Sequence, residues 1–273
     1  MKVAIIGAGT IGLYLGKELQ KRGVEVFIFE KKKEIGKKVC SGLFSERILD
    51  FIPESKKIIE KEIESCLIHF PKKTIQLDFE KKFFLIDHLK LDNLLFDLAK
   101  NVGVKIFLNS EVKKLPENFD KIIGCDGANS EIRKILKLEK PNFFLGIQAF
   151  EEKVENQNFV ETWPTKNGFL WKIPRKNSIE YGIYEKPKIA FENFQKFLLE
   201  NEIKTEQMQS SLIAQGLVLP KKENITLCGE AAGLTKPWSG GGVIWGLVAA
   251  NFLLETFPDF KKYHKKVSMF FKK

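Results

Sequence analysis

The sequence predicts an α/β fold in which a parallel-sheet domain, assembled from discontinuous segments, is joined to a smaller β-rich domain. Three observations predict it. Residues 2–29 read as strand, glycine-rich turn, helix and strand, residues 141–219 are rich in strand-like segments and aromatic side chains, and α/β character returns after residue 220. Because strand–helix–strand units build parallel sheets, we expect the two ends of the chain to share one sheet.

Hydrophobic periodicity places the individual elements. Residues 2–6 and 24–29 are apolar strands on either side of a helix at 11–22, which ends at Gly23. Leucines at helical spacing predict a further helix at 89–100. The other expected elements are short β pieces within 58–86, strands at 104–108, 121–124, 143–150, 168–173, 179–184 and 225–228, and helices at 191–201 and from about 243.

The same texture predicts the domain boundaries. We expect the parallel-sheet domain to comprise residues 1–57, 87–140 and 220–273, and the β-rich domain to comprise residues 58–86 and 141–219. The β-rich domain is then expected to cover a ligand that the parallel-sheet domain binds.

Composition and charge limit the classes of function. The chain of 273 residues is 44% hydrophobic and 29% charged, as is typical of a globular protein. Its net charge of +10 comes from lysines scattered along the chain without a nucleic-acid-binding motif, which argues against nucleic acid as a partner. The basic segment 261–273 also carries Phe270 and Phe271, so peripheral contact with anionic lipid headgroups stays open.

The cysteines, the histidines and the apolar segments indicate the cellular compartment and whether a metal site is expected. The four cysteines form no CxxC pair, so we expect reduced thiols in a cytoplasmic protein. The chain enters its first strand at once, without the pattern of a signal peptide. The longest apolar run, 243–254, suits a buried helix better than a membrane span. The three histidines are isolated, and we expect no metal site.

A glycine-rich turn, GAGTIG at residues 7–12, follows the first strand and opens the first helix. Gly7 permits the tight turn, Gly9 lets a pyrophosphate approach the backbone, and Gly12 lets helix and strand pack closely. The helix N-terminus offers a partial positive charge to the phosphates. Glu30 closes the second strand, where a carboxylate can accept hydrogen bonds from ribose hydroxyls. The pattern predicts a bound dinucleotide.

Two later motifs favour FAD over a nicotinamide dinucleotide. The sequence IIGCDGANS at 122–130 is an apolar strand that ends in Asp126-Gly127. GEAAG at 229–233 and PWSGGG at 237–242 place an acid at a strand end and a loop of bare backbone before a helix. Such a site can bind a ribityl chain and present amide N–H groups to a flavin ring.

With these motifs the sequence resembles the FAD-dependent oxidoreductases of the p-hydroxybenzoate hydroxylase fold and, within that group, the geranylgeranyl reductase family. The three motifs occur in the family's order and bracket most of the chain. The resemblance implies a Rossmann-like FAD-binding domain of the glutathione reductase/p-hydroxybenzoate hydroxylase type, FAD as the cofactor, and the β-rich domain as the substrate domain. The residues that we expect to bind the cofactor are Gly7, Gly9, Thr10, Ile11, Gly12, Glu30, Lys31, Cys40, Ser41, Gly42, Val112, Cys125, Asp126, Gly127, Gly229, Glu230, Gly240, Gly241 and Gly242.

Two further elements resemble the reductase branch. Cys40-Ser41-Gly42 is similar to the Cys-x-Gly loop that those reductases place beside the flavin. GFLWKIP at 168–174 is similar to their aromatic-x-Trp-x-Phe-Pro segment. The catalytic candidates are therefore Cys40, as proton donor or positioner, together with Trp171 and Trp238. The alternative for these side chains is a purely structural role in a loop or an aromatic core.

The sequence also departs from the family pattern. Glu230 stands where Asp is usual, and His88 follows Asp87 where the fold usually carries Arg. The stretch between residues 100 and 126 is short, and the chain ends at residue 273, soon after the GGG turn. These departures predict a reduced substrate domain.

The expected activity is reduction of C=C bonds in isoprenoid chains, or in another apolar small molecule. Reduced FAD would deliver a hydride from N5, and Cys40 or a positioned water would deliver the proton, in a site that excludes water. NAD(P)H or a ferredoxin-like protein would supply the electrons. Three alternatives stay open: a flavin monooxygenase, a non-catalytic flavin-binding protein, and a nicotinamide dehydrogenase, for which the motifs at 122–130 and 229–233 leave little room.

Overall fold

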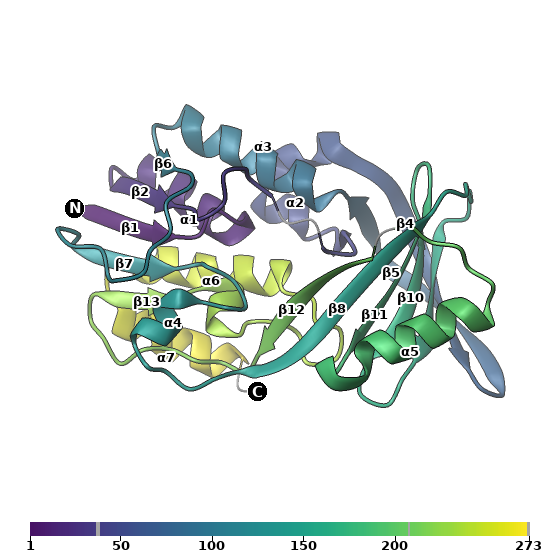
Figure 1. Ribbon diagram of the computed structural model, residues 1–273. Coiled ribbons are helices and arrows are strands. Elements are labelled where there is room, and N and C mark those ends of the chain that lie inside the picture. The colour runs from purple at the N-terminus through teal and green to yellow at the C-terminus, as the bar shows by residue number, and fades with distance from the viewer. Residues whose placement is uncertain (37–38, 207, 272–273) are drawn as a thin grey trace. The chain divides into compact units, whose positions relative to one another are not determined.

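The protein folds into two compact units, drawn as a ribbon in Figure 1. The computed structural model describes residues 1–36, 39–206 and 208–271. The first unit comprises Met1–Lys37, Leu91–Asn142 and Ala214–Lys273, and the second comprises Lys38–Lys90 and Phe143–Ile213. Segments far apart in the sequence therefore build each unit.

The first unit contains a five-stranded parallel sheet. Its strands are β1 (Lys2–Ile6), β2 (Glu25–Phe29), β6 (Lys105–Phe107), β7 (Lys121–Gly124) and β13 (Ile225–Leu227). Their order across the sheet is β13-β7-β1-β2-β6, and each neighbouring pair is parallel. The strands are short apolar runs because both faces of such a sheet are covered, and Val3, Ala4 and Ile5 in the central strand are fully buried.

Helices pack on this sheet and on one another (Figure 1). They are α1 (Thr10–Lys21), most of α3 (His88–Asn101), α4 (Glu131–Ile135), α6 (Val243–Thr256) and α7 (Phe260–Phe271), with the short 3₁₀ helix η2 (Gly229–Ala232). α6 is almost entirely apolar and contacts both α1 and α7. α7 buries Phe260, Tyr263 and Val267, and the Tyr263 hydroxyl donates a hydrogen bond to the Leu227 carbonyl at 3.1 Å.

The second unit is built on an eight-stranded sheet. Its strands are β3 (Leu43–Ser45), β4 (Ile59–Phe70), β5 (Lys73–Ile86), β8 (Asn142–Glu151), β9 (Phe159–Pro164), β10 (Phe169–Pro174), β11 (Ile179–Glu185) and β12 (Gln209–Gln215). Their order is β12-β8-β11-β10-β9-β4-β5-β3. β4 and β9 pair in parallel, whereas β4–β5, β9–β10, β10–β11 and β8–β11 are antiparallel pairs. The helix α2 (Ile48–Phe51) and the 3₁₀ helix η1 (Pro53–Ile58) connect β3 to β4.

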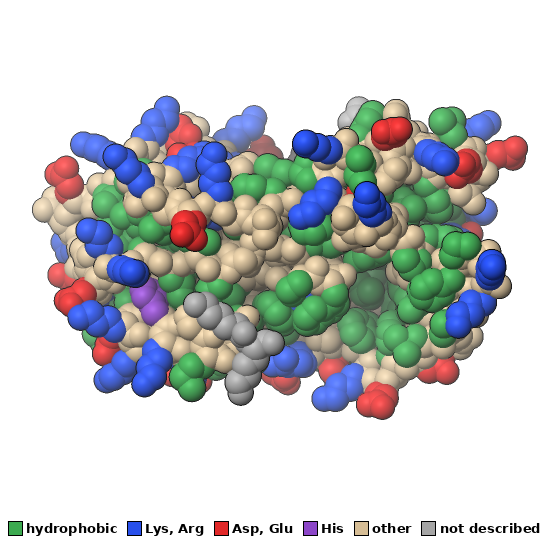
Figure 2. Space-filling view, turned by 90° about the horizontal axis from the view of Figure 1, so that it is seen from below, with side chains coloured by type: hydrophobic (Ala, Val, Ile, Leu, Met, Phe, Trp, Pro, Cys, Tyr) green, Lys and Arg blue, Asp and Glu red, His purple; other side chains and the backbone are tan. Residues whose placement is uncertain are grey.

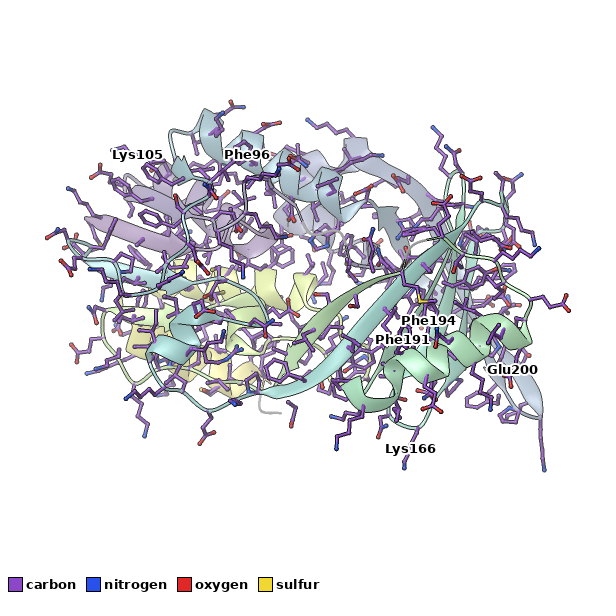
Figure 3. The ribbon with its side chains drawn as sticks, viewed as in Figure 1. Phe96, Lys105, Lys166, Phe191, Phe194 and Glu200 are labelled. Atoms are coloured by element: carbon purple, nitrogen blue, oxygen red, sulfur yellow. The ribbon has the colours of Figure 1, made fainter. Side chains whose placement is uncertain are left out.

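One longer helix, α5 (Pro187–Glu200), packs on this sheet (Figure 3). Pro187 suits the first position of the helix, since a backbone N–H there would lack a partner within the helix. Phe194 is fully buried among sheet residues such as Ile147 and Tyr181, whereas Phe191 is largely exposed. The apolar stripe of α5 therefore fixes the helix to the sheet.

The predicted α/β fold class is confirmed: one unit contains a parallel sheet of discontinuous segments, and the other unit is β-rich. The sequence assigns residues 38–57 to the parallel-sheet domain, whereas they fold with the second unit because β3 pairs with β5. The sequence also treats residues 261–273 as a basic tail, whereas α7 forms there since its three buried residues recur at helical spacing. On the face seen in Figure 2, lysine and arginine side chains are spread among acidic and apolar ones, as the sequence suggests.

Candidate functional site

Three glycine-containing turns lie together at one edge of the parallel sheet. They follow β1, β7 and β13, which are neighbours in the sheet, so the carboxyl ends of the three strands meet. Open α/β sheets bind their ligands at this edge. The sheet order therefore gathers the motifs at 7–12, 125–130 and 229–233, as their chemistry requires.

In the turn after β1, two of the three glycines leave no room for a side chain. Gly7 has φ +103°, and a Cβ there would lie 2.5 Å from the Cys125 carbonyl oxygen. A Cβ on Gly12 would lie 2.0 Å from the Gly7 carbonyl oxygen. A Cβ on Gly9, by contrast, meets nothing within 4 Å. Gly7 and Gly12 thus allow the turn to fold, while Gly9 leaves open space in front of the N-terminus of α1.

Polar side chains hold this turn in place. The Glu30 carboxylate accepts hydrogen bonds from the Ala8 and Lys32 backbone N–H groups, both at 2.9 Å. The Thr10 hydroxyl donates to the buried carboxylate of Asp92 in α3 at 2.6 Å. Glu30 therefore lies at the end of β2, beside the glycine turn, where a ribose hydroxyl could reach it.

Asp126 follows β7 and has one unused carboxylate oxygen. Its Oδ2 accepts hydrogen bonds from the backbone N–H groups of Glu131 and Ile132 at 2.7 and 3.1 Å, which ties the start of α4 to the strand end. Its Oδ1 is buried and has no hydrogen-bond partner among the described residues. Burial raises the pKa of Asp126. A buried acceptor without a donor is costly, and a ligand hydroxyl would satisfy it.

Arg133 joins the second motif to the third. Its Nη1 donates to the Ala231 carbonyl at 2.8 Å, and its Nη2 donates to the Ala128 carbonyl. Burial lowers the pKa of Arg133, against the opposing charges of Asp126 and Glu230. The sequence shows Arg133 only as a helix residue, and its bridging role requires the fold.

The third motif packs on the first through Ile11. A Cβ on Gly229, which has φ +66°, would lie 3.0 Å from Ile11 Cγ1, and a Cβ on Gly246 of α6 would lie 2.7 Å from Ile11 Cδ1. In the loop before α6, Lys236 and Gly241 share a backbone hydrogen bond of 3.1 Å. Three successive glycines of that loop, Gly240, Gly241 and Gly242, then lead into the helix.

Lys31 and Val112 also belong to the first unit. Lys31 is exposed next to Glu30, and Val112 is half-buried between β6 and β7. Their contribution to cofactor binding stays a prediction, as does that of Cys125, Gly127 and Glu230, although the latter three lie in the turns described above.

The predicted Cys-x-Gly loop belongs to the second unit. Gly42 has φ +62°, and a Cβ there would lie 2.3 Å from the Ile86 carbonyl oxygen, so only glycine fits. The Gly42 N–H donates to Cys40 Sγ at 3.5 Å, and the Gly42 carbonyl accepts from the Ile86 N–H at 2.9 Å. The Ser41 carbonyl accepts a hydrogen bond from Arg175. The two residues that follow Cys40 are therefore each fixed by a hydrogen bond, Ser41 by Arg175 and Gly42 by Ile86.

Trp171 lies in the same unit, on β10. Its indole packs on Gly182 of β11, where a Cβ would lie 2.1 Å from Trp171 Cζ2, and the two residues face each other in the strand register. The indole N–H donates to Glu180 Oε1 at 2.9 Å. Glycine opposite the tryptophan and a carboxylate next to it thus fix the indole ring.

Trp238 lies in the first unit, in the loop before α6. It is 68% exposed and contacts Trp245 edge-on, with 5.7 Å between ring centroids. Cys40 and Trp171 belong to the second unit, whereas Trp238 belongs to the first. The catalytic assignment of all three stays a prediction.

Sequence reasoning misses Arg175 and Glu180. Glu180 is fully buried, and Arg175 donates to it from Nε at 3.0 Å and also from Nη2. Arg175 directly follows the Trp171 motif, and Glu180 alternates with apolar residues on β11. A glutamate between apolar residues of the strand is the signal that could have indicated Glu180, although the same strand ends in a second buried glutamate, Glu185.

The edge of the parallel sheet fits FAD. The open backbone at Gly9 and the N-terminus of α1 suit a pyrophosphate, Glu30 suits ribose hydroxyls, and the unpaired Oδ1 of Asp126 suits a further ligand hydroxyl. Each of these groups offers what the matching part of the cofactor needs: space and N–H donors for the phosphates, and acceptors for the hydroxyls.

Comparison with known proteins leads to the same cofactor. Residues 1–122 match the family model of the FAD binding domain. The chain is 26% identical to an uncharacterized protein of Methanocaldococcus jannaschii, over 97% of this chain and 79% of that protein. It is 24% identical to a digeranylgeranylglycerophospholipid reductase of Methanococcus vannielii, over 88% of this chain and 72% of that protein.

A solved structure shares the fold. The geranylgeranyl bacteriochlorophyll reductase-like protein of Thermoplasma acidophilum superposes with a TM-score of 0.83 at 18% identity, over 98% of this chain and 83% of that chain. The predicted fold class and FAD as the cofactor are thereby confirmed.

Proposed function

We propose that this protein is an FAD-dependent oxidoreductase of the geranylgeranyl reductase family and that it reduces carbon–carbon double bonds of isoprenoid chains. One observation carries the proposal. The second unit holds the Cys40 loop and the Trp171 strand, the two elements typical of the reductases, in one hydrogen-bonded network.

The proposed reaction needs a hydride and a proton. Bound, reduced FAD supplies the hydride to one alkene carbon. We assign the proton for the other carbon to the Cys40 thiol, whose Sγ is oriented by the Gly42 N–H. An isolated alkene is weakly polar, so orientation and exclusion of water contribute most to the rate. Trp171 packs against a buried apolar cluster that includes Ile63 and Ile173. This packing supports an apolar surface that excludes water from the isoprenoid chain.

The substrate class and electron donor extend this proposal. The relative from Methanococcus vannielii is named for a lipid that carries geranylgeranyl chains, which favours an isoprenoid chain on a polar headgroup. NAD(P)H or a ferredoxin-like protein delivers the electrons. Supplying each donor alone without oxygen identifies the one that bleaches the flavin absorbance.

A membrane-bound substrate calls for contact with the membrane surface. Among the described residues, no helix is both long and apolar enough to cross a bilayer. Trp238, Met269 and Phe270 are large apolar side chains that are 68%, 62% and 51% exposed, and we call them the aromatic patch. Trp245 connects Trp238 to Phe270, because it contacts Trp238 and Phe271, and Phe271 contacts Phe270.

Charge near the aromatic patch favours an anionic surface. α7 carries four lysines, of which Lys261, Lys262 and Lys266 each pair with a surface carboxylate, and no acidic residue of its own. Exposed ion pairs of this kind are weak and exchange readily with lipid phosphates. We therefore assign the protein to the cytoplasm, in peripheral contact with the inner face of the membrane.

Vesicle sedimentation tests the membrane contact. The protein should pellet with phosphatidylglycerol vesicles and stay in solution with phosphatidylcholine vesicles. The double variant W238A/F270A should bind at least about tenfold more weakly, since both side chains are mostly exposed and their removal leaves the fold intact. Equal sedimentation of the two proteins would contradict the contact.

Product analysis tests the activity itself. The FAD-loaded protein, reduced without oxygen and mixed with a geranylgeranyl lipid, should yield products heavier by the mass of two hydrogens for each double bond reduced. Oxygenated products formed only in air would instead support the monooxygenase alternative, and unchanged lipid in both cases would support a non-catalytic flavoprotein.

A further inference from the structure

Arg175 and Glu180 form a buried pair in the second unit. The Glu180 side chain has no exposed area, and that of Arg175 is 11% exposed. One carboxylate oxygen accepts from Arg175, through both Nε and Nη2, and the other accepts from the Trp171 indole N–H. Both oxygens of the buried carboxylate are therefore used.

The Arg175 guanidinium has a second task that an ion pair alone does not require. Its Nη2 also donates to the carbonyl of Ser41, which lies 134 residues away in the sequence. Its Nη1 lies 3.9 Å from Glu60 Oε2, and a Cβ on Gly42 would lie 3.2 Å from it. The guanidinium therefore lies directly against the Cys-x-Gly loop.

Electrostatics favours the charged form of Arg175. Burial on its own lowers the pKa of Arg175, but Glu180, Glu60 and the Cys40 thiolate outweigh burial and raise it. Glu60 in turn pairs with Lys90 at 2.8 Å. The positive charge of Arg175 thus lies between the carboxylates of Glu180 and Glu60, against the loop that carries Cys40.

The loop has little freedom to move away from Arg175. Gly42 lies against the Ile86 carbonyl, and its own carbonyl accepts from the Ile86 N–H. With one side of the loop fixed by β5, the hydrogen bond from Arg175 to Ser41 fixes the other side. Moving Arg175 would therefore move the backbone that carries Cys40.

We propose that Arg175 and Glu180 are positioning residues that hold the Cys40 loop and the Trp171 indole in one fixed arrangement. Arg175 orients the loop through Ser41 and places its positive charge beside that loop, and Glu180 orients the indole and anchors Arg175. The catalytic consequence rests on the proposed reductase function, whereas the effect on the Cys40 sulfur does not.

Two substitutions at Arg175 separate charge from geometry. R175K keeps the positive charge but replaces the planar fork, so it cannot serve Ser41 and Glu180 together. R175Q removes the charge. R47Q is the matched control for charge removal, because Arg47 is an exposed arginine of the same unit, over the ring of Phe51.

Alkylation of Cys40 by iodoacetamide in the full-length, FAD-loaded protein measures the effect on the sulfur, with the modified peptide identified by mass spectrometry. Burial raises the pKa values of the Cys66, Cys125 and Cys228 thiols, so Cys40 should react first. R175Q should slow the alkylation of Cys40 at least about threefold, whereas R175K and R47Q should leave it near the wild-type rate.

Turnover measures the effect on geometry. For reduction of a geranylgeranyl lipid, R175K should lower kcat at least about tenfold with KM changed less than about threefold, and R47Q should change neither. A purely structural pair would instead lower the melting temperature and leave kcat per bound FAD unchanged in R175K, which would overturn the proposal.

The two readouts separate this proposal from the proposed function. If the wild-type protein reduces no double bond, the reductase function fails, and the alkylation rates still decide whether Arg175 acts on Cys40. If R175Q folds and alkylates at the wild-type rate, the positioning role fails even where the wild-type protein is an active reductase. If R175Q does not fold, R175K decides through kcat.

Discussion

The two units build their predicted sites by opposite means. In the first unit, glycines and backbone groups form the site, and its few side chains are fixed by backbone N–H groups, as Glu30 and Asp126 are. In the second unit, a buried ion pair between Arg175 and Glu180 holds a loop and an indole ring. We therefore expect added volume to destabilise the fold of the first site most, and removal of charge to destabilise the fold of the second site most.

The largest expected effect is the removal of Glu180. E180A removes the fully buried partner of Arg175 and leaves only the longer contact of 3.9 Å with Glu60, which should lower the free energy of unfolding by about 3–5 kcal/mol. E180Q, which keeps an acceptor for the Trp171 indole, should cost less. Urea unfolding of both variants measures the difference. Equal stability of E180A and wild type would contradict the claim that the ion pair stabilises the second unit.

Added volume tests the backbone site. G12A places a Cβ 2.0 Å from the Gly7 carbonyl oxygen and should destabilise the protein without its cofactor by about 1–3 kcal/mol. G9A meets no atom within 4 Å, so its stability should stay near that of the wild type while its FAD affinity falls. Thermal unfolding of the cofactor-free proteins and FAD titration distinguish the two. A stable G12A would contradict the steric account of the turn.

A pH titration sharpens the role of Asp126. Burial raises the pKa of its carboxyl in the folded protein without cofactor, so the folded state holds its proton to a higher pH than the unfolded chain, whose pKa is about 3.9. That contribution to stability should therefore fall as the pH rises from about 4 through the raised pKa.

FAD should counteract this penalty, since a ligand hydroxyl that donates to Oδ1 favours the ionised form. FAD affinity should then increase over the same pH range, and D126N should lower affinity about tenfold at neutral pH and flatten the pH dependence. Fluorescence titration of FAD at several pH values measures both. A pH-independent affinity of the wild type would show that Oδ1 meets no cofactor hydroxyl.

The smallest effect concerns one hydrogen bond of the ion-pair site. W171F keeps an aromatic ring on Gly182 but removes the indole N–H that donates to Glu180, which should cost about 1 kcal/mol. W238F is the control, because Trp238 is mostly exposed and should tolerate the change. Denaturant unfolding that finds W171F and W238F equally stable would mean that the indole hydrogen bond contributes nothing.

The contrast between the units also explains what the sequence could predict. The glycine turns and acids of the first unit act through local spacing, so Gly7, Gly12, Glu30 and Asp126 are readable from short motifs, and FAD follows from them. Arg133 is different, because its two carbonyl partners belong to turns that meet only in the folded sheet.

The second unit hides its organisation from sequence reasoning. Ser41 and Arg175 meet through a sheet in which β3 pairs with β5 and β9 pairs with β4, and neither pairing leaves a local pattern. The Cys-x-Gly loop and the Trp171 segment are visible only as a resemblance, while the pair that joins them is not. The helix α7 is likewise hard to predict, because its lysines mask the helical spacing of three buried apolar residues.

The anaerobic reoxidation of the flavin tests the central claim most directly. The purified protein with bound FAD is reduced without oxygen and mixed with a geranylgeranyl lipid while the flavin absorbance is followed. The reductase account predicts that the oxidised flavin spectrum returns in proportion to the lipid added. A flavin that stays reduced with the lipid, and reoxidises only when air is admitted, would contradict it.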